Sequence, residues 1–463
     1  MTKIPAANKQ FPSLIQRFGP SILLVLMILY FTGTSLFVAF NLQRDIVPDE
    51  PYHVEVAIRF ARTWGIPKNV TAAKNIGLYM RQSPYLSYWI SGRALNFLNL
   101  LKPDPSPWQQ LVFLRLLNIL FSIGTVIFTY LFSKELINNR WWQLLPVFVL
   151  TNTLMFVLLS SGVNYDNPAN LFSIASLYYL LRVLNGKPFF PNSLGWLVLI
   201  TTGTLVKETL LPLALAMAVV WIIFIVRNRK KIDLSELKHP RLIGLLVILL
   251  ILIGANLALY GVNLLRHRSL TSSCAYYYTE EFCDNTAFAQ RRRELALSEE
   301  PNVFEAFRQG YPEPLRYAFD IWIEAMLMKI FGIMGGARSY YPISISYYHM
   351  LLYWMLALGF RYFRKTSFRN YSLVGIFVFY ALTLFIKNYD IELAYGFIQV
   401  AHQGRYIFPV IGLGYSLFSY LLMKVPHRWL RIPTLVASIA LFFYGGPIRF
   451  FLYYQTVFAE WFI

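Results

Sequence analysis

The densest group of acidic residues in this chain lies between Asp45 and Glu55. The segment reads DIVPDEPYHVE and places Asp49 beside Glu50 and close to His53, in a chain with only 23 acidic residues among 463. An adjacent acidic pair can supply a general base that takes a proton from a hydroxyl or amine. The second carboxylate can orient the acceptor or bind a metal ion. A solvated charged loop is the alternative interpretation.

Three more charged residues stand beside apolar segments. They are Asp166 in SGVNYDNPAN, Lys207 in LVKETLLP, and Arg405 in HQGRYIFP, where Gln403 and Tyr406 flank it. Carboxylates combined with cations suit a substrate that has a leaving phosphate. Simpler roles stay open: Asp166 could cap a helix, Lys207 could reach lipid head groups, and Arg405 could bind lipid phosphate non-specifically.

The sequence indicates no certain cofactor. His53 and His402 have no second ligand at the spacing of a zinc site, so a divalent metal ion stays only an open possibility. Neither a phosphate-binding GxxxxGK[ST] loop nor a GxGxxG motif after a strand is present, which argues against a nucleotide site.

Long apolar segments must position these charged residues. The chain is 57% hydrophobic and 14% charged, whereas soluble domains are roughly 25% charged. Segments long enough to span a membrane lie at 21–40, 110–132, 142–160, 168–184, 193–206, 209–226, 242–262, 345–360, 371–386, 405–423 and 433–450. We therefore predict an all-α polytopic membrane protein with about eleven transmembrane helices.

The net charge of +19 comes from short basic clusters between these segments, which favours contact with membrane lipids and argues against nucleic acid. The positive-inside rule predicts cytoplasmic loops at 227–241, 361–369 and 424–431, and the alternation of sides adds 134–140. The first apolar segment has no signal-peptide cleavage pattern, so it reads as a retained helix with a cytoplasmic N-terminus. The candidate residues then share the non-cytoplasmic face.

Two segments do not fit simple spans. Residues 84–101 are apolar but carry Arg93 at mid-length, and a span there would break the alternation of sides, so we predict an external interfacial helix. The apolar stretch 193–226 is interrupted by Lys207 and Glu208. We predict a hairpin of two short helices that turns at the outer surface.

The predicted organisation has three parts: a catalytic transmembrane module at 1–262 with its first external loop at 41–110, an external loop at 263–344, and C-terminal transmembrane helices at 345–463. The only cysteines, Cys274 and Cys283, fall in the external loop. Their spacing permits a disulfide in an oxidising compartment, and two unpaired thiols are the alternative.

Several of these motifs together resemble a known fold. PDEPYHVE at 48–55, the YDNP step at 165–168, the hairpin at Lys207 and QGRY at 403–406 are similar to the GT-C glycosyltransferases. The nearest resemblance is to bacterial membrane proteins with PDEPxH and QGRY signatures. Aminoarabinose and protein-mannosyl transferases are more distant relatives.

The resemblance implies sugar transfer from a polyprenyl-phosphate donor to an unknown glycan, lipid or protein acceptor outside the cytoplasm, at the bacterial inner (plasma) membrane. In it Asp49 corresponds to the catalytic aspartate, Glu50 to its acidic neighbour and Asp166 to the second acidic position, while Lys207 and Arg405 would face the donor phosphate. His53, Gln403 and Tyr406 belong to the same motifs and are predicted to bind substrate.

We therefore predict an inverting glycosyltransferase with Asp49 as its general base. The alternatives are a transporter or flippase of lipid-linked sugars, and a lipid-glycan ligase or polymerase of another fold. Clustering of charges on one face, rather than along a route through the membrane, favours the enzyme.

Overall fold

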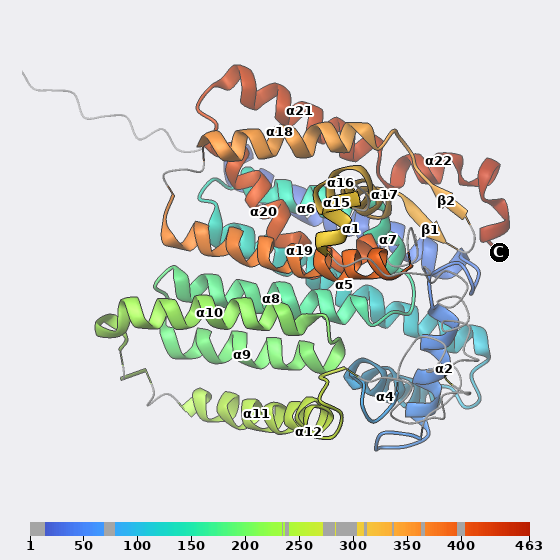
Figure 1. Ribbon diagram of the computed structural model, residues 1–463. Coiled ribbons are helices and arrows are strands. Elements are labelled where there is room, and N and C mark those ends of the chain that lie inside the picture. Colours follow the sequence, from blue (N-terminus) through green and yellow to red (C-terminus); the bar gives the residue numbers. More distant parts are fainter. Residues whose placement is uncertain are drawn as a thin grey trace, which may run out of the picture.

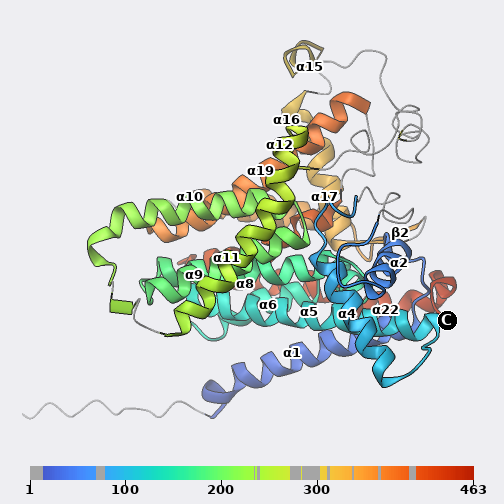
Figure 2. The ribbon, with the colours of Figure 1, turned by 90° about the horizontal axis from the view of Figure 1, so that it is seen from below.

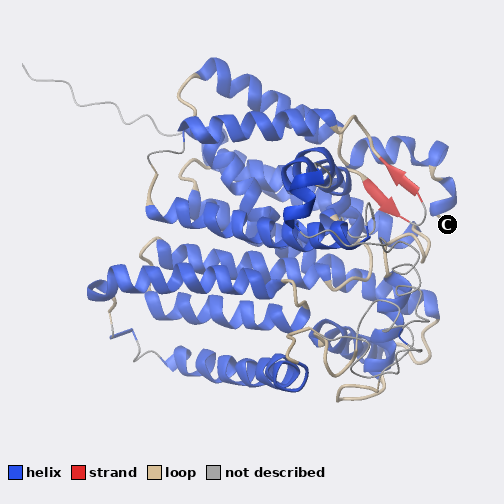
Figure 3. Ribbon diagram, in the orientation of Figure 1, coloured by secondary structure: helices blue, strands red, loops and turns tan. Residues whose placement is uncertain are grey.

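The computed structural model is almost entirely helical (Figure 3). In the part of the chain that it describes, the only paired strands are β1 (Ile333–Gly335) and β2 (Arg338–Tyr340), which run antiparallel. The described residues are 14–68, 79–233, 235–236, 240–271, 283, 303–309, 313–335, 338–362, 366–395 and 403–463.

In the part of the chain that the structure describes, ten long helices form the bundle (Figure 1). They are α1 (Leu14–Asn41), α5 (Pro107–Leu136), α8 (Asp166–Leu184), α9 (Phe189–Val206), α10 (Leu210–Asn228), α11 (Pro240–Asn256), α18 (Ser346–Tyr362), α19 (Phe368–Tyr395), α20 (Phe408–Lys424) and α21 (Arg428–Tyr444). Within the described ranges, eight helices are long and apolar enough to cross a membrane, or nine with one bent pair. The predicted all-α polytopic membrane fold is therefore confirmed.

The predicted number of eleven spans is not confirmed, although all eleven segments are helical. Neither α8 nor α18 is among the eight spanning helices. Polar residues such as Asp166, Asn170 and Arg182 lower the hydropathy of α8, and α18 has only 17 residues.

The predicted span at 142–160 is a bent pair of short helices, which could cross the membrane only as one broken span. This segment consists of η1 (Trp142–Leu144), α6 (Leu145–Thr151) and α7 (Leu154–Ser160), with a bend of 66°. The bend lies at Thr153, whose backbone is extended with ψ 108°. Its hydroxyl donates to Val149 O at 2.9 Å and hydrogen bonds with the Tyr415 hydroxyl at 2.8 Å, which fixes the break against α20.

The predicted hairpin at Lys207 is confirmed, because α9 ends at Val206 and α10 begins at Leu210. Residues 84–101 also form a separate helix, α4 (Leu86–Leu101), which is not among the spanning helices. It packs against α2 (Glu50–Ala61) at one end of the bundle (Figure 2). The location of α4 in the membrane interface stays a prediction.

Close packing of α2 and α4 explains how a charge fits into an apolar helix. A Cβ atom on Gly92 would lie 2.7 Å from the backbone of Phe60 and Ala61, so only glycine allows this approach. Arg93 then donates to the carbonyls of Phe60 and Thr63, the latter at 2.6 Å, and lies 4.4 Å from the Trp64 ring centroid. The end of α2 therefore accepts two hydrogen bonds from Arg93 Nη2, while Nε and Nη1 have no partner among the described residues.

The shorter elements lie mostly at the same end of the bundle as α2 (Figure 1). They are η2 (Arg229–Lys231), η4 (Leu257–Gly261), α12 (Val262–His267), α15 (Val303–Gln309), α16 (Pro314–Arg316), η6 (Tyr317–Trp322), α17 (Ile323–Phe331), η7 (Gly404–Ile407), α22 (Pro447–Val457) and η8 (Ala459–Trp461). At the opposite end, α10, α18 and α20 end and α11, α19 and α21 begin (Figure 1). The helix ends that flank the three basic loops therefore share one end of the bundle, away from α2.

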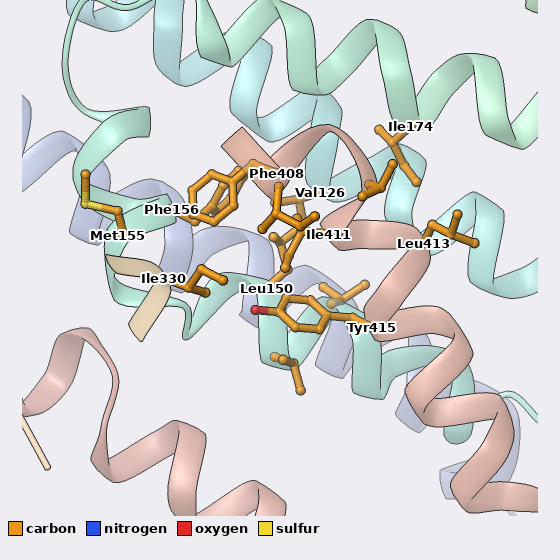
Figure 4. Close-up of a cluster of buried hydrophobic side chains, with 14 of the residues drawn as sticks. Val126, Leu150, Met155, Phe156, Ile174, Ile330, Phe408, Ile411, Leu413 and Tyr415 are labelled. Carbon is orange, nitrogen blue, oxygen red and sulfur yellow. The ribbon is translucent and has the colours of Figure 1, made fainter. Parts of the chain in front are cut away.

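The apolar core centres on α20 (Figure 4). Phe408, Ile411 and Tyr415 of α20 pack with Val126 of α5 and Phe156 of α7 in one buried cluster. Because α20 is held on several sides, the short turn η7 at its N-terminus has a fixed position. The core thus positions the QGRY segment.

Candidate active site

Four charged side chains from distant parts of the sequence meet at the α2 end of the bundle. Arg405 Nη2 lies 2.8 Å from Asp49 Oδ2, and Arg405 Nε lies 3.7 Å from Asp166 Oδ2. Lys207 Nζ donates a hydrogen bond to Asp166 Oδ1. The structure therefore brings together two acidic and two basic residues that the sequence analysis selected.

Asp49 is the most accessible member of this group. Its side chain is 39% exposed, whereas those of Asp166 and Arg405 are 4% and 6% exposed. It occupies the N-cap position of α2 with a left-handed φ of 64°, and its carboxylate makes no capping hydrogen bond. A non-glycine residue in this region is under strain that the surrounding structure must maintain. The carboxylate is thus directed to the charged group instead of to the helix.

The ionised form of Asp49 is favoured by its neighbours. Burial alone would raise the pKa of this carboxyl, but the charge and hydrogen bond of Arg405, with Lys207 nearby, hold its pKa below the usual value. Asp49 is therefore a carboxylate at neutral pH and able to accept a proton.

The pair of Asp166 and Lys207 is buried, which overturns the simpler interpretation of each. The N-cap of α8 is Tyr165, and the backbone N–H of Asp166 donates to the Asn164 side chain at 2.7 Å, so Asp166 does not cap the helix. Lys207 is only 6% exposed and does not extend to lipid head groups. Its Nζ lies 4.7 Å and 4.6 Å from the ring centroids of Tyr165 and Tyr406.

Arg405 lies in the turn η7. Gln403 is the N-cap of this turn, and its carbonyl accepts a hydrogen bond from Tyr406 N at 2.9 Å. Arg405 is buried, so it is not a surface residue that collects lipid phosphates non-specifically. Within the described residues, Arg405 Nε and Nη1 have no hydrogen-bond partner. The guanidinium therefore has donors available for a ligand.

Lys329 of α17 is a basic residue near the site that the sequence analysis missed. It is 6% exposed, and burial together with the charge of Arg405 lowers its pKa to about 8. The two segments touch at Gly404, where a Cβ atom would lie 2.6 Å from the Lys329 carbonyl carbon. The sequence signal for a buried Lys329 was its position beside the apolar residues Met326, Leu327 and Ile330, which form the buried face of a short helix. The predicted external loop thus contributes to the site.

Glu50 does not join Asp49, although the two are adjacent in sequence. Its carboxylate accepts from Arg115 Nε at 2.9 Å and Nη2 at 2.6 Å, and from Val163 N at 2.9 Å. Arg115 also donates to the carbonyls of Ala39 and Leu42 at the end of α1. We interpret Glu50 as a positioning residue that fixes the start of α2 against α1 and α5.

His53 lies behind the charged group. Its Nδ1 hydrogen bonds with the Tyr88 hydroxyl at 2.7 Å, and its ring packs on the edge of Tyr165 with centroids 4.8 Å apart. Burial lowers the pKa of His53 to about 4, so the ring is neutral at pH 7. It supports Tyr165, which in turn covers Lys207.

Other predicted features are not settled by this geometry. Among the residues described, no group of three or more His, Cys, Asp or Glu side chains could hold a metal ion. Cys274 and His402 lie outside the described residues. The disulfide between Cys274 and Cys283 therefore stays a prediction.

Residues 109–255 match the family described as "Dolichyl-phosphate-mannose-protein mannosyltransferase". No curated protein sequence matches the chain.

The solved structures to which the chain is similar include three membrane proteins. ArnT from Cupriavidus metallidurans, bound to undecaprenyl phosphate, is 14% identical with a TM-score of 0.47, over 90% of this chain and 62% of that one. The oligosaccharyltransferase AglB from Archaeoglobus fulgidus is 12% identical with a TM-score of 0.47, over 94% of this chain and 57% of that one. The arabinosyltransferase EmbB from Mycobacterium smegmatis is 11% identical with a TM-score of 0.43, over 92% of this chain and 31% of that one.

The present chain thus spans less than two thirds of the length of each of these proteins. The resemblance to GT-C glycosyltransferases expected from the sequence is confirmed, through a family match that contains Asp166 and Lys207 but neither the PDEPxH nor the QGRY signature.

Proposed function

We propose that this protein is a membrane glycosyltransferase that moves a sugar from a polyprenyl-phosphate donor to an acceptor on the non-cytoplasmic side. The observation that carries the proposal is the contact between a partly exposed carboxylate, Asp49, and a buried cation, Arg405, which has donors to spare. A base and an anion site lie side by side, as transfer from a phosphate-linked donor requires.

The cations supply the anion site. Arg405 and Lys207 pair with the carboxylates of Asp49 and Asp166, and Lys329 lies close enough to Arg405 to feel its charge. A donor phosphate that binds Arg405 would replace Asp49 as the partner of the guanidinium. The Asp49 carboxylate would then be released toward the acceptor, while the cations offset the charge that develops on the leaving phosphate.

The proposed reaction is a single displacement. The acceptor hydroxyl or amine attacks the anomeric carbon and loses its proton to Asp49. The bond between that carbon and the phosphate oxygen breaks, and its electron pair leaves with the polyprenyl phosphate. Attack in line with the leaving group inverts the configuration at the anomeric carbon.

The basic loops support our proposal that the site lies on the non-cytoplasmic side of the membrane. The helix ends that flank the basic loops share the end of the bundle opposite the site, and the positive-inside rule assigns that end to the cytoplasm. Nucleotide sugars are cytoplasmic, so a site on the other side needs a lipid-carried donor. We place the protein in the plasma membrane, which is the inner membrane of a Gram-negative cell.

Purified protein in lipid vesicles tests this function. It is incubated with a cell-envelope extract as the source of acceptor and with a panel of polyprenyl-phosphate sugars labelled in the sugar, and label that remains on lipid is measured over time. We expect one donor to lose its sugar, with polyprenyl phosphate as the second product. Movement of intact lipid-linked sugar across the vesicle, with no cleavage of any donor, would support a flippase instead.

A further inference from the structure

A groove between α9 and α10 lies at the end of the bundle opposite the charged site. Its volume is about 460 Å³, within the roughly 300–1,000 Å³ range of small-molecule sites. The lining comes from the start of α9, including Phe189 and Leu194, and from the end of α10, including Trp221 and Ile225. Arg229 is the single charged residue in this lining.

The inner wall of the groove is an ordered aromatic surface. The Phe189 ring stacks on Trp221 with centroids 6.2 Å apart, and Trp196 meets Trp221 edge-on at 5.8 Å. The Trp221 indole N–H donates to Ser193 Oγ at 3.0 Å, so the polar atom of this ring is satisfied inside the wall. The surface left for a ligand is therefore apolar and fits a hydrocarbon chain.

The mouth of the groove carries the guanidinium of Arg229, which forms no ion pair with a described acidic residue. Arg229 is exposed, and the described part of the chain forms no ion pair with it. Its neighbour Arg227 instead lies over the Phe368 ring at 4.7 Å, and Glu236 accepts a hydrogen bond from Phe190 N at 3.0 Å. Arg229 is thus the cation available to a ligand in the groove.

The surroundings of the groove belong to the membrane. Both α9 and α10 are among the helices long and apolar enough to span a bilayer, and α10 exposes Ile222 and Val226 beside the lining residues Trp221 and Ile225. An occupant must therefore be an amphiphile with an apolar chain and an anionic head group. We propose that this groove binds one anionic glycerophospholipid, with its phosphate at Arg229 and an acyl chain on the Trp221 wall.

Lipid titration of the full-length protein in neutral detergent tests the site. Native mass spectrometry measures the binding of phosphatidylglycerol and of phosphatidylcholine with the same acyl chains. We expect tighter binding of phosphatidylglycerol. Arg229→Gln should weaken it about five-fold, the effect of one cation near an anionic head group, and should leave phosphatidylcholine unchanged. Leu194→Trp, which fills the groove, should weaken both lipids.

Lys230→Gln is the matched control because it removes the same charge from the next residue, which does not line the groove. Thermal midpoints without added lipid verify that each variant is folded. Equal weakening by Lys230→Gln, or unchanged binding in Leu194→Trp, would overturn the site. The assignment to a phospholipid would be overturned if inorganic phosphate displaced phosphatidylglycerol as effectively as phosphatidylglycerol itself does. It would also be overturned if a polyprenyl phosphate bound at this groove more tightly than phosphatidylglycerol.

Discussion

Replacing Glu50 with glutamine should destabilise the protein, because the substitution leaves a buried cation without its counter-ion. The side chains of Arg115 and Glu50 are both 0% exposed, and two hydrogen bonds of 2.9 and 2.6 Å join them. Breaking such a pair from one side costs about 3 to 5 kcal/mol. The entropy of unfolding is proportional to chain length and is about 1 kcal/mol/K for 463 residues. Dividing the loss of free energy by this entropy gives a fall of about 3 to 5 °C in the thermal midpoint.

The assay is thermal unfolding in detergent, with two comparisons. Glu55→Gln is the control, since the pair of Glu55 and Arg59 is half-exposed at 3.8 Å and should contribute less than about 1 kcal/mol. The double variant Glu50→Leu/Arg115→Met removes both charges but leaves Val163 N and the carbonyls of Ala39 and Leu42 without these partners, so it should recover only part of the loss. An unchanged midpoint in Glu50→Gln, combined with lost transfer activity, would refute the positioning role and return Glu50 to the catalytic group.

Three more predictions concern pH, backbone packing and the cysteines. The pKa of His53 is about 4 in the folded protein and about 6.5 in the unfolded chain, so the unfolded chain takes up the proton first as the pH falls. The free energy of unfolding should therefore fall by roughly 3 kcal/mol between pH 6.5 and pH 4. The variant His53→Gln should have a thermal midpoint that depends less on pH over this range. Gly404→Ala should reduce transfer at least ten-fold, because its Cβ atom meets the backbone of α17, whereas Gly375→Ala, with nothing within 4 Å, should be neutral. Mass spectrometry of non-reduced protein should show one peptide linked through Cys274 and Cys283, and two alkylatable thiols would exclude the bridge.

Local features of the sequence were sufficient to predict much of the fold. Apolar length located every long helix, and charges inside apolar segments identified the hairpin at Lys207 and the separate helix at Arg93. The same reasoning selected Asp49 and Arg405 from the ends of apolar segments. Their contact could not be derived from local pattern, because 356 positions separate them in the chain.

The features that were missed depend on contacts across the fold. Glu50 looked equivalent to Asp49 until Arg115, on a different helix, was seen to occupy its carboxylate. The bend at Thr153 depends on packing against α20, and an apolar segment gives little warning of it. Lys329 joins the site only because Gly404 allows α17 to approach.

The central claim is that Asp49 is the base of a glycosyl transfer, and the rate of the Asp49→Asn variant tests it most directly. The amide keeps the shape of the side chain but cannot accept the proton, so transfer from the lipid-linked donor should slow by about 10²- to 10⁴-fold. The size-exclusion profile should stay that of the wild type, and the thermal midpoint should fall less than in Glu50→Gln, because Arg405 keeps Asp166 as a second acidic neighbour. A folded Asp49→Asn protein that transfers sugar at the wild-type rate would contradict the account.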